Sequence, residues 1–235
     1  MIRSTCFVLA LVAALILSGC VEDEHWNQKL TLIVQTPNGE ITGSVVQRID
    51  WEGVSGLYAE ATKSNEGAKT KMSVTGEALA LEIAPGRWLF ALLKGDQGWK
   101  GEPGTNFGYA VGVPKGHFAR SQEAVGDILA LPKDTPVTLP REAWPMLVTF
   151  DEVAKPETVR RVDPNDVAAT FGSGVELKGV TLEVTVMPVT EGRIEGLLSW
   201  LPSIGGGMLD GAAISSIEAA NRLANDLTRL DIVRP

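Results

Sequence analysis

Residues 79–92, LALEIAPGRWLFAL, carry the clearest hairpin pattern in the chain. Apolar side chains alternate with other residues on both sides of Pro85-Gly86: Leu79, Leu81 and Ile83 before it, and Trp88, Phe90 and Leu92 after it. Proline presets φ and glycine tolerates a positive φ, so this pair is typical of a type II turn. Alternation with a period of two indicates a strand that buries one face. The stretch therefore predicts a β-hairpin.

Other parts of the chain carry the same period. Leu30, Leu32 and Val34 alternate before the turn Pro37-Asn38-Gly39, and the pattern resumes after it, which predicts a second hairpin over residues 29–49. Together, residues 29–94 predict antiparallel sheet of the kind found in a sandwich. Residues 146–150 predict a buried strand. Residues 180–186 alternate most clearly of all, as expected for a strand with one buried and one solvated face.

Helices are predicted at four places. Residues 121–131 predict a short helix weakened by Gly126. Residues 167–171 predict another, with Asp163 as N-cap, Pro164 in the first position and Asp166 in the third. Residues 191–201 carry an amphipathic stripe that Pro202 ends.

The fourth helix is predicted at the C-terminal end of the sequence. A linker over residues 202–212 contains a run of three glycines, and residues 213–231 then predict an amphipathic helix that either packs on the core or docks on a partner. The predicted fold class is α+β. An antiparallel, sandwich-like body with short helices spans residues 29–201 as a single domain.

The N-terminal sequence predicts where in the cell the protein is located. Arg3 precedes an apolar run over residues 7–17, which is too short to span a membrane. The next residues, Leu17-Ser18-Gly19-Cys20, resemble the lipobox of bacterial lipoproteins. The resemblance implies a signal peptide over residues 1–19, cleavage between Gly19 and Cys20, acylation of Cys20, and a lipidated tether over residues 20–28. The alternative is an ordinary or uncleaved signal with an accidental cysteine.

The same resemblance bears on location and on disulfides. Val21 follows the cysteine where enteric lipoproteins retained in the inner membrane carry Asp, so the periplasmic face of the outer membrane is expected rather than the inner membrane. Cys6, the other cysteine of the chain, lies in the segment that would be removed. The mature chain would then hold no disulfide.

Composition excludes some partners. The formal net charge is −8, which disfavours nucleic acid and a basic membrane-binding patch. The apolar fraction of 44% and the charged fraction of 21% are typical of a globular chain.

Motifs for enzymatic chemistry are absent from the sequence. It has no Gly-x-Ser-x-Gly elbow, no Ser-x-x-Lys and no phosphate loop. His25 and His117 are too few for a zinc site, so neither a metal nor a cofactor is predicted. Carboxylate pairs such as Asp151-Glu152, or Asp96 with Glu102, leave a hydrolase open as the least favoured class.

Residues 95–117 are rich in glycine and predict a long flexible loop that carries Trp99, Phe107 and Tyr109. These aromatic residues are the candidates for contact with a ligand or partner, the alternative being that Trp99 is half-tucked against the body. Trp51, Trp88 and Trp144 lie in or beside strand patterns and are expected in the core.

A second resemblance covers residues 139–201. It rests on PMLVTFD at residue 145, VRRVDP at residue 159, FGSGV at residue 171, TLEVT at residue 181, PVT at residue 188 and Trp200-Leu201. These motifs are similar to an uncharacterised family of proteobacterial proteins, some of them envelope lipoproteins, and HWNQKL at residue 25 is similar to the lipoprotein members. The likeness implies no activity and no site residues.

The expected function is that of a non-enzymatic envelope lipoprotein. It would be anchored in the lipid bilayer through Cys20 and would bind a protein partner through the glycine-rich loop or the terminal helix. The alternative is a module that binds glycans of peptidoglycan or lipopolysaccharide through exposed aromatic side chains.

Overall fold

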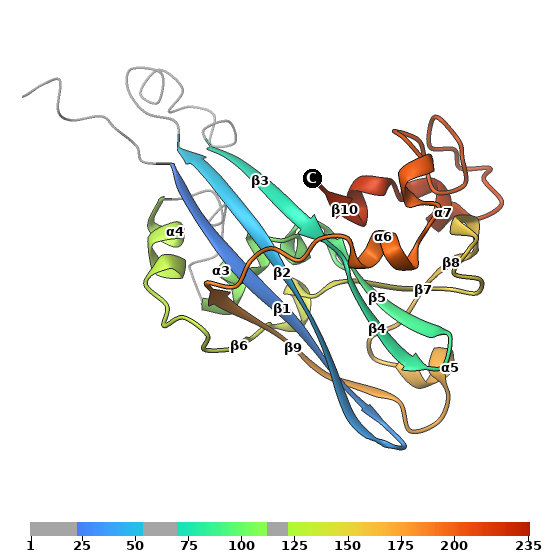
Figure 1. Cartoon of the computed structure of the whole chain (residues 1–235), viewed down its shortest axis with the longest axis horizontal. Coiled ribbons are helices and arrows are strands. Elements are labelled where there is room, and N and C mark those ends of the chain that lie inside the picture. The colour runs from blue at the N-terminus through green and yellow to red at the C-terminus, as the bar shows by residue number, and fades with distance from the viewer. Residues whose placement is uncertain (1–22, 54–69, 112–121) are drawn as a thin grey trace, which may run out of the picture.

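The computed structural model describes residues 23–53, 70–111 and 122–235. It contains two antiparallel sheets, one of six strands in the order β10-β3-β2-β1-β9-β6 and one of four in the order β4-β5-β7-β8 (Figure 1). The predicted α+β, antiparallel and sandwich-like fold class is confirmed. The predicted signal peptide and Cys20 lie outside the described residues.

The first hairpin joins β1 (Glu24–Thr36) to β2 (Gly39–Gly53) and is longer than predicted. Trp26 continues the buried face of β1, and so does Gln28, which is fully buried and donates to Gln47 Oε1 at 3.3 Å. A polar residue at an inward position hid the strand's start from the hydrophobic pattern. The predicted tether over residues 20–28 is therefore wrong from Glu24 onward, where the sheet begins.

The second hairpin is confirmed: β4 (Leu79–Ala84) pairs with β5 (Arg87–Gly95), and Gly86 turns between them with a φ of 72°. The chain reaches β4 from β3 (Thr70–Glu77), which belongs to the other sheet and pairs with both β2 and β10 (Val233–Arg234). Where β3 leaves β2, Thr190 replaces it. The Val46 N–H donates to Thr190 Oγ1 at 2.9 Å, and the Thr190 N–H donates to the Val46 carbonyl at 3.0 Å.

The remaining strands complete the two sheets. β9 (Glu176–Thr185) pairs with β1 and with the edge strand β6 (Val137–Thr138), while β7 (Pro145–Phe150) lies between β5 and β8 (Val159–Arg161). The strand predicted over residues 180–186 is confirmed as far as Thr185.

Two apolar cores lie on opposite faces of the four-stranded sheet. Leu89, Ala91 and Leu147 face the six-stranded sheet, while Phe90 and Val148 face the C-terminal part of the chain. Every residue of β7 is buried, because both faces of its sheet are covered.

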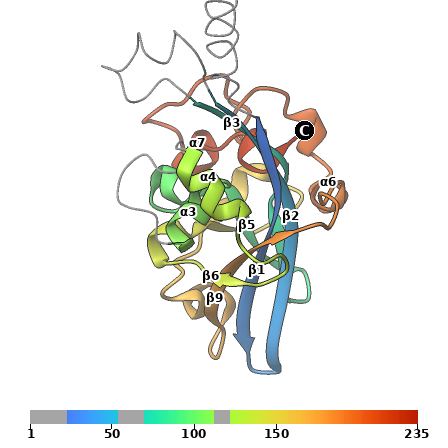
Figure 2. The same cartoon turned by 90° about the vertical axis from the view of Figure 1, so that its left-hand side faces the viewer.

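Helices α3 (Thr105–Val111) and α4 (Gln122–Leu129) close the first core beside the long strands (Figure 2). Short 3-10 turns lie at η1 (Gly98–Gly101), η3 (Arg141–Ala143) and η4 (Pro156–Thr158). The helix predicted over residues 167–171 is confirmed as α5 (Val167–Phe171), but its N-cap is Asp166, which accepts from Ala169 N at 3.1 Å. The Asp163 carboxylate instead accepts from Asn165 N, in a turn before the helix.

The C-terminal part of the chain differs most from expectation. The predicted helix over residues 213–231 is wrong: α7 spans Arg222–Asp226 alone, and η6 (Arg229–Asp231) follows it. Asn221 starts α7 by accepting from Leu223 N and Ala224 N, and Ile217 of the expected apolar stripe is exposed. Side chains that cap locally therefore divide the segment.

The predicted linker over residues 202–212 is also wrong, since it is packed. It begins in η5 (Leu201–Ser203), and its Leu209 is buried and donates its N–H to the Leu227 carbonyl at 2.9 Å. With α6 (Arg193–Leu197), these residues form the C-terminal layer, residues 193–235, which covers the second core. The helix predicted over residues 191–201 is confirmed for the residues of α6.

Candidate functional site

Residues 95–111 are folded, so the prediction of a long flexible loop is wrong for them; residues 112–117, with His117, lie outside the described residues. Gly95 and Gly101 serve close packing. A Cβ at Gly95 would lie 1.9 Å from the Gly98 carbonyl oxygen, and one at Gly101 would lie 2.0 Å from that of Trp144. These positions admit no side chain, which explains their glycines without any need for flexibility.

The structure separates the three aromatic candidates. Phe107 is fully buried in the first core, where α3 packs against the six-stranded sheet, and is therefore not a surface contact residue. Trp51 is buried as expected, and Trp88 and Trp144 are partly buried against the two cores.

Trp99 and Tyr109 lie together on the surface. The side chain of Trp99 is 50% exposed, and its ring centroid is 6.1 Å from that of Tyr109 at an interplanar angle of 55°. Lys100 Nζ lies 5.5 Å from the centroid of the Tyr109 ring, within range of a cation–π interaction. Burial and the charge of Glu142 raise the pKa of Tyr109, which keeps its hydroxyl protonated. We call Trp99, Lys100 and Tyr109 the aromatic platform.

The base of the aromatic platform is held by a buried carboxylate. Asp96 accepts from Arg141 Nη2 at 2.7 Å and from Arg161 Nη2 at 2.5 Å, and its side chain is 6% exposed. Its N–H donates to the carbonyl of Trp144, and Arg141 stacks over the Trp144 ring at 5.1 Å. Segments far apart in the sequence are thus joined at Asp96, three residues before Trp99.

The two arginines decide the ionisation of Asp96. Burial alone would raise its pKa, but the hydrogen bonds and charges of Arg161 and Arg141 outweigh that effect and hold the pKa below its usual range. An ionised, doubly paired carboxylate is suited to fixing a segment rather than to donating a proton.

We expect Asp96→Asn to lower the free energy of unfolding by about 2 kcal/mol at neutral pH, because two charge-assisted hydrogen bonds lose their anion. Because the pKa of Asp96 is lower in the folded state, this carboxylate stabilises the fold at any pH above its unfolded-state pKa of about 3.9. That stabilisation is lost as the pH falls through the folded-state pKa. The difference between wild type and variant in urea denaturation should therefore shrink in acid. Asp151→Asn is the control: Asp151 pairs with Arg160 at the surface, so its loss should cost less than about 1 kcal/mol. Equal costs for the two variants would contradict the role assigned to Asp96.

Asp151 and Glu152, two of the other candidate acids, are also held in ion pairs. Asp151 contacts Arg160 and Glu152 contacts Lys155, both at 2.7 Å, and both pairs are on the surface. Within the described ranges, no group of three or more His, Cys, Asp or Glu side chains is placed to hold a metal ion. His25 lies exposed in β1 rather than in a tether.

A second buried carboxylate lies elsewhere in the fold. Glu77 of β3 is 2% exposed, burial raises its pKa, and it accepts from Ile194 N at 3.2 Å. It lines a pocket of about 310 Å³ together with Glu195 and Arg229, which pair with each other at 3.1 Å. This acid ties α6 to the sheet, and its place at an inward strand position gave no signal in the sequence.

Comparison with known proteins gives no family for this chain. No family model, no curated protein and no solved structure matches it. The likeness of residues 139–201 to a proteobacterial family stays a prediction. In the part of the chain that the structure describes, no helix has the length and apolar character needed to cross a membrane.

Proposed function

We propose that this protein is a non-enzymatic envelope lipoprotein, anchored through Cys20, that binds a protein partner through its aromatic platform. The observation that carries the proposal is the half-exposed Trp99 beside Tyr109 on a segment fixed by Asp96. Cys20 supports the anchor by its resemblance to a lipobox.

The chemistry of the aromatic platform favours a protein partner. Trp, Tyr and Arg dominate the residues that supply binding energy at protein interfaces, and large aromatic side chains bury much area for few lost rotamers. Because residues 95–101 are held by backbone packing and by Asp96, little conformational entropy remains to be lost on binding. Lys100 adds a cation at the rim, where it would favour acidic groups on the partner.

A glycan ligand is the second candidate, and the exposed ring of Trp99 is the observation that favours it. Sugars stack on exposed aromatic faces, and peptidoglycan and lipopolysaccharide are the glycans that an envelope protein meets. Lys100 lies over the ring of Tyr109, which leaves Trp99 as the larger open aromatic surface.

A photo-crosslinking residue at position 99 tests the proposal in whole cells. We expect a discrete crosslinked protein band that disappears when Tyr109→Ala is added, because the neighbouring ring supports the contact. The matched control carries the crosslinker at Glu40, which is exposed at the turn between β1 and β2. A band of equal strength at both positions, or none at position 99, would contradict a protein-binding platform. A change in Trp99 fluorescence on titration with muropeptides, with no crosslinked protein, would favour the glycan.

A further inference from the structure

We propose that the end of the six-stranded sheet where β1 begins rests on the lipid bilayer that holds Cys20, with Val186 and Met187 in its headgroup region. The inference rests on the proposed lipid anchor and adds to it an orientation and a contact surface. We call His25, Lys133, Val186 and Met187 the anchor-end surface.

The distance to the membrane is set by the length of chain before the sheet. Three residues lie between Cys20 and Glu24, the first residue of β1, so the four Cα-to-Cα steps from Cys20 to Glu24 span about 14 Å at full extension. The anchor would therefore confine this end of the sheet to the immediate neighbourhood of the lipid headgroups. The turn between β1 and β2 lies at the other end of the same strands.

Two exposed apolar residues follow β9 at the anchored end. β9 ends at Thr185, opposite Asn27 and three residues from the start of β1, which corresponds to about 10 Å along the strand. The side chain of Val186 is 72% exposed and that of Met187 is 48% exposed. Together they form an exposed apolar pair, which lies close enough to the start of β1 to contact a bilayer that holds Cys20.

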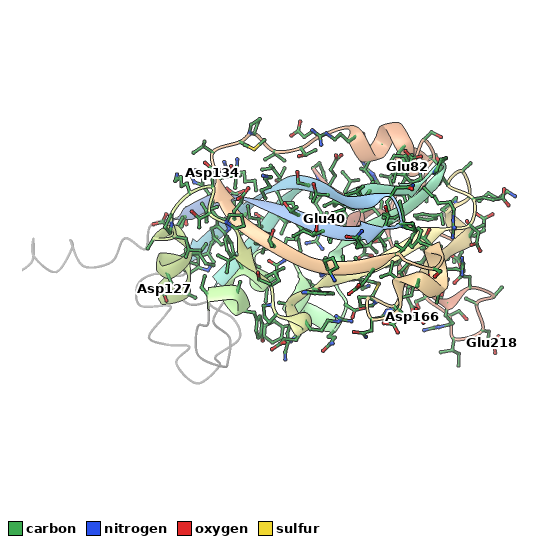
Figure 3. All side chains as sticks on the ribbon, turned by 90° about the horizontal axis from the view of Figure 1, so that it is seen from below. Glu40, Glu82, Asp127, Asp134, Asp166 and Glu218 are labelled. Atoms are coloured by element: carbon green, nitrogen blue, oxygen red, sulfur yellow. The ribbon has the colours of Figure 1, made fainter. Side chains whose placement is uncertain are left out.

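Hydrogen bonds hold the backbone at Val186 and Met187 in place. Asn27 Nδ2 donates to the Met187 carbonyl at 2.8 Å, and the Met187 N–H donates to Thr185 Oγ1 at 3.2 Å. Thr185 Oγ1 donates in turn to the Asp134 carboxylate at 2.7 Å. Figure 3 shows Asp134 at one end of the molecule, far from Glu218 at the other. Val186 and Met187 are thus presented by an ordered strand end.

A pocket of about 220 Å³ lies between α4 and the sheet at the same end. His25, Arg48 and Lys133 are among its lining residues, and His25 and Lys133 are exposed. His25 and Lys133 suit the phosphate of a phospholipid headgroup, whereas Arg48 is already paired with the Asp50 carboxylate at 2.7 Å. Asp23 and Asp134 also lie at this end, so apolar contact and confinement by the anchor, rather than net charge, would hold the surface to the bilayer.

Site-specific fluorescence tests the contact in the full mature lipoprotein. Under the proposed anchor, Cys6 is removed and Cys20 is alkylated, so Val186→Cys supplies the one reactive thiol for an attached fluorophore. The protein is reconstituted in phosphatidylcholine vesicles containing a lipid with a spin label near its headgroup. Glu40→Cys and Glu218→Cys, both exposed and away from this end, are the matched controls. Met187→Cys provides a second probe position if Val186→Cys does not fold.

We expect the fluorophore at position 186 to lose roughly half of its emission to the spin label, as an interfacial residue would, and the controls to lose little. If the protein floats with the vesicles but position 186 is quenched no more than position 40, the orientation is wrong and the anchor stands. If the protein does not float with the vesicles, the anchor itself is wrong and the orientation falls with it.

Discussion

Truncation of the chain after Ile204 is expected to abolish cooperative folding. The removed residues include Leu209, Ala224, Leu227 and Ile232, each at most 1% exposed in the second core. Burying a leucine or isoleucine is worth about 1.5–3 kcal/mol, so the loss approaches the whole stability of an ordinary domain. The truncation would also expose Phe90 and Val148 of the four-stranded sheet to water, an apolar surface that favours aggregation.

Thermal unfolding followed by near-ultraviolet circular dichroism measures this effect. The expected result is a truncated chain without a sharp transition and with its aromatic signal lost. Point variants give the same test within the full chain. Leu227→Ala should lower the free energy of unfolding by about 2–5 kcal/mol. Ile217→Ala, at a residue that is 87% exposed, should lower it by less than about 0.5 kcal/mol. A truncated chain that unfolds as cooperatively as the full one would show that the C-terminal layer is a separate appendage.

Gly101→Ala is expected to lower the free energy of unfolding by about 3 kcal/mol, which is the upper end of the usual effect of overpacking. The new Cβ would lie 2.0 Å from the Trp144 carbonyl oxygen and 2.8 Å from Gly95 Cα, and backbone atoms cannot yield as a flexible side chain can. The chain must therefore move apart under the aromatic platform. We expect Trp99 to lose its fixed contact with Tyr109 and binding at the platform to weaken together with stability.

Gly126→Ala is the control for this prediction. Gly126 lies in α4, and a Cβ there would meet nothing within 4 Å beyond the backbone of its own helix, so alanine should raise the free energy of unfolding by up to about 1 kcal/mol. Chemical denaturation of both variants, with Trp99 fluorescence as a second signal, separates the two effects. A stabilising or neutral Gly101→Ala would contradict the close packing assigned to the glycine-rich segment.

Hydrophobic periodicity predicted those elements whose pattern is local. The hairpins at residues 29–49 and 79–92 and the strand ending at Thr185 follow from alternation and turn residues, and all are present. The start of β1 was missed because Gln28 occupies a buried position that its hydrogen bonds with Trp26 and with Gln47, a neighbour in the folded sheet, make acceptable. Tertiary partners of this kind are invisible in a local pattern.

The candidate site was predicted in part. Trp99 and Tyr109 were identified by residue type, but their pairing depends on η1 and α3, which the glycines concealed. Glycine indicates flexibility and close backbone approach equally well, and only the approach of Trp144 to Gly101 distinguishes them. The clamp of Asp96 with Arg141 and Arg161 joins residues 45 and 65 positions apart, beyond the reach of any spacing rule.

The prediction of one long C-terminal helix was wrong for a related reason. An apolar stripe at helical spacing fits residues 213–231, yet Asn221 and the Thr228–Asp231 capping box each begin a new short element inside it. Leu227 then accepts a backbone hydrogen bond from Leu209, a residue of the predicted linker, and both pack in the second core. Capping side chains within a periodic stretch are the sequence signal that distinguishes the two outcomes.

Mass spectrometry of the protein extracted from bacterial membranes tests whether Cys20 carries the lipid anchor on which the proposed function depends. We expect a chain that begins at Cys20, with a diacylglycerol on its sulfur and an N-terminal peptide heavier by the mass of the attached lipid. A free thiol at Cys20, or a chain that retains residues 1–19, would contradict the anchor.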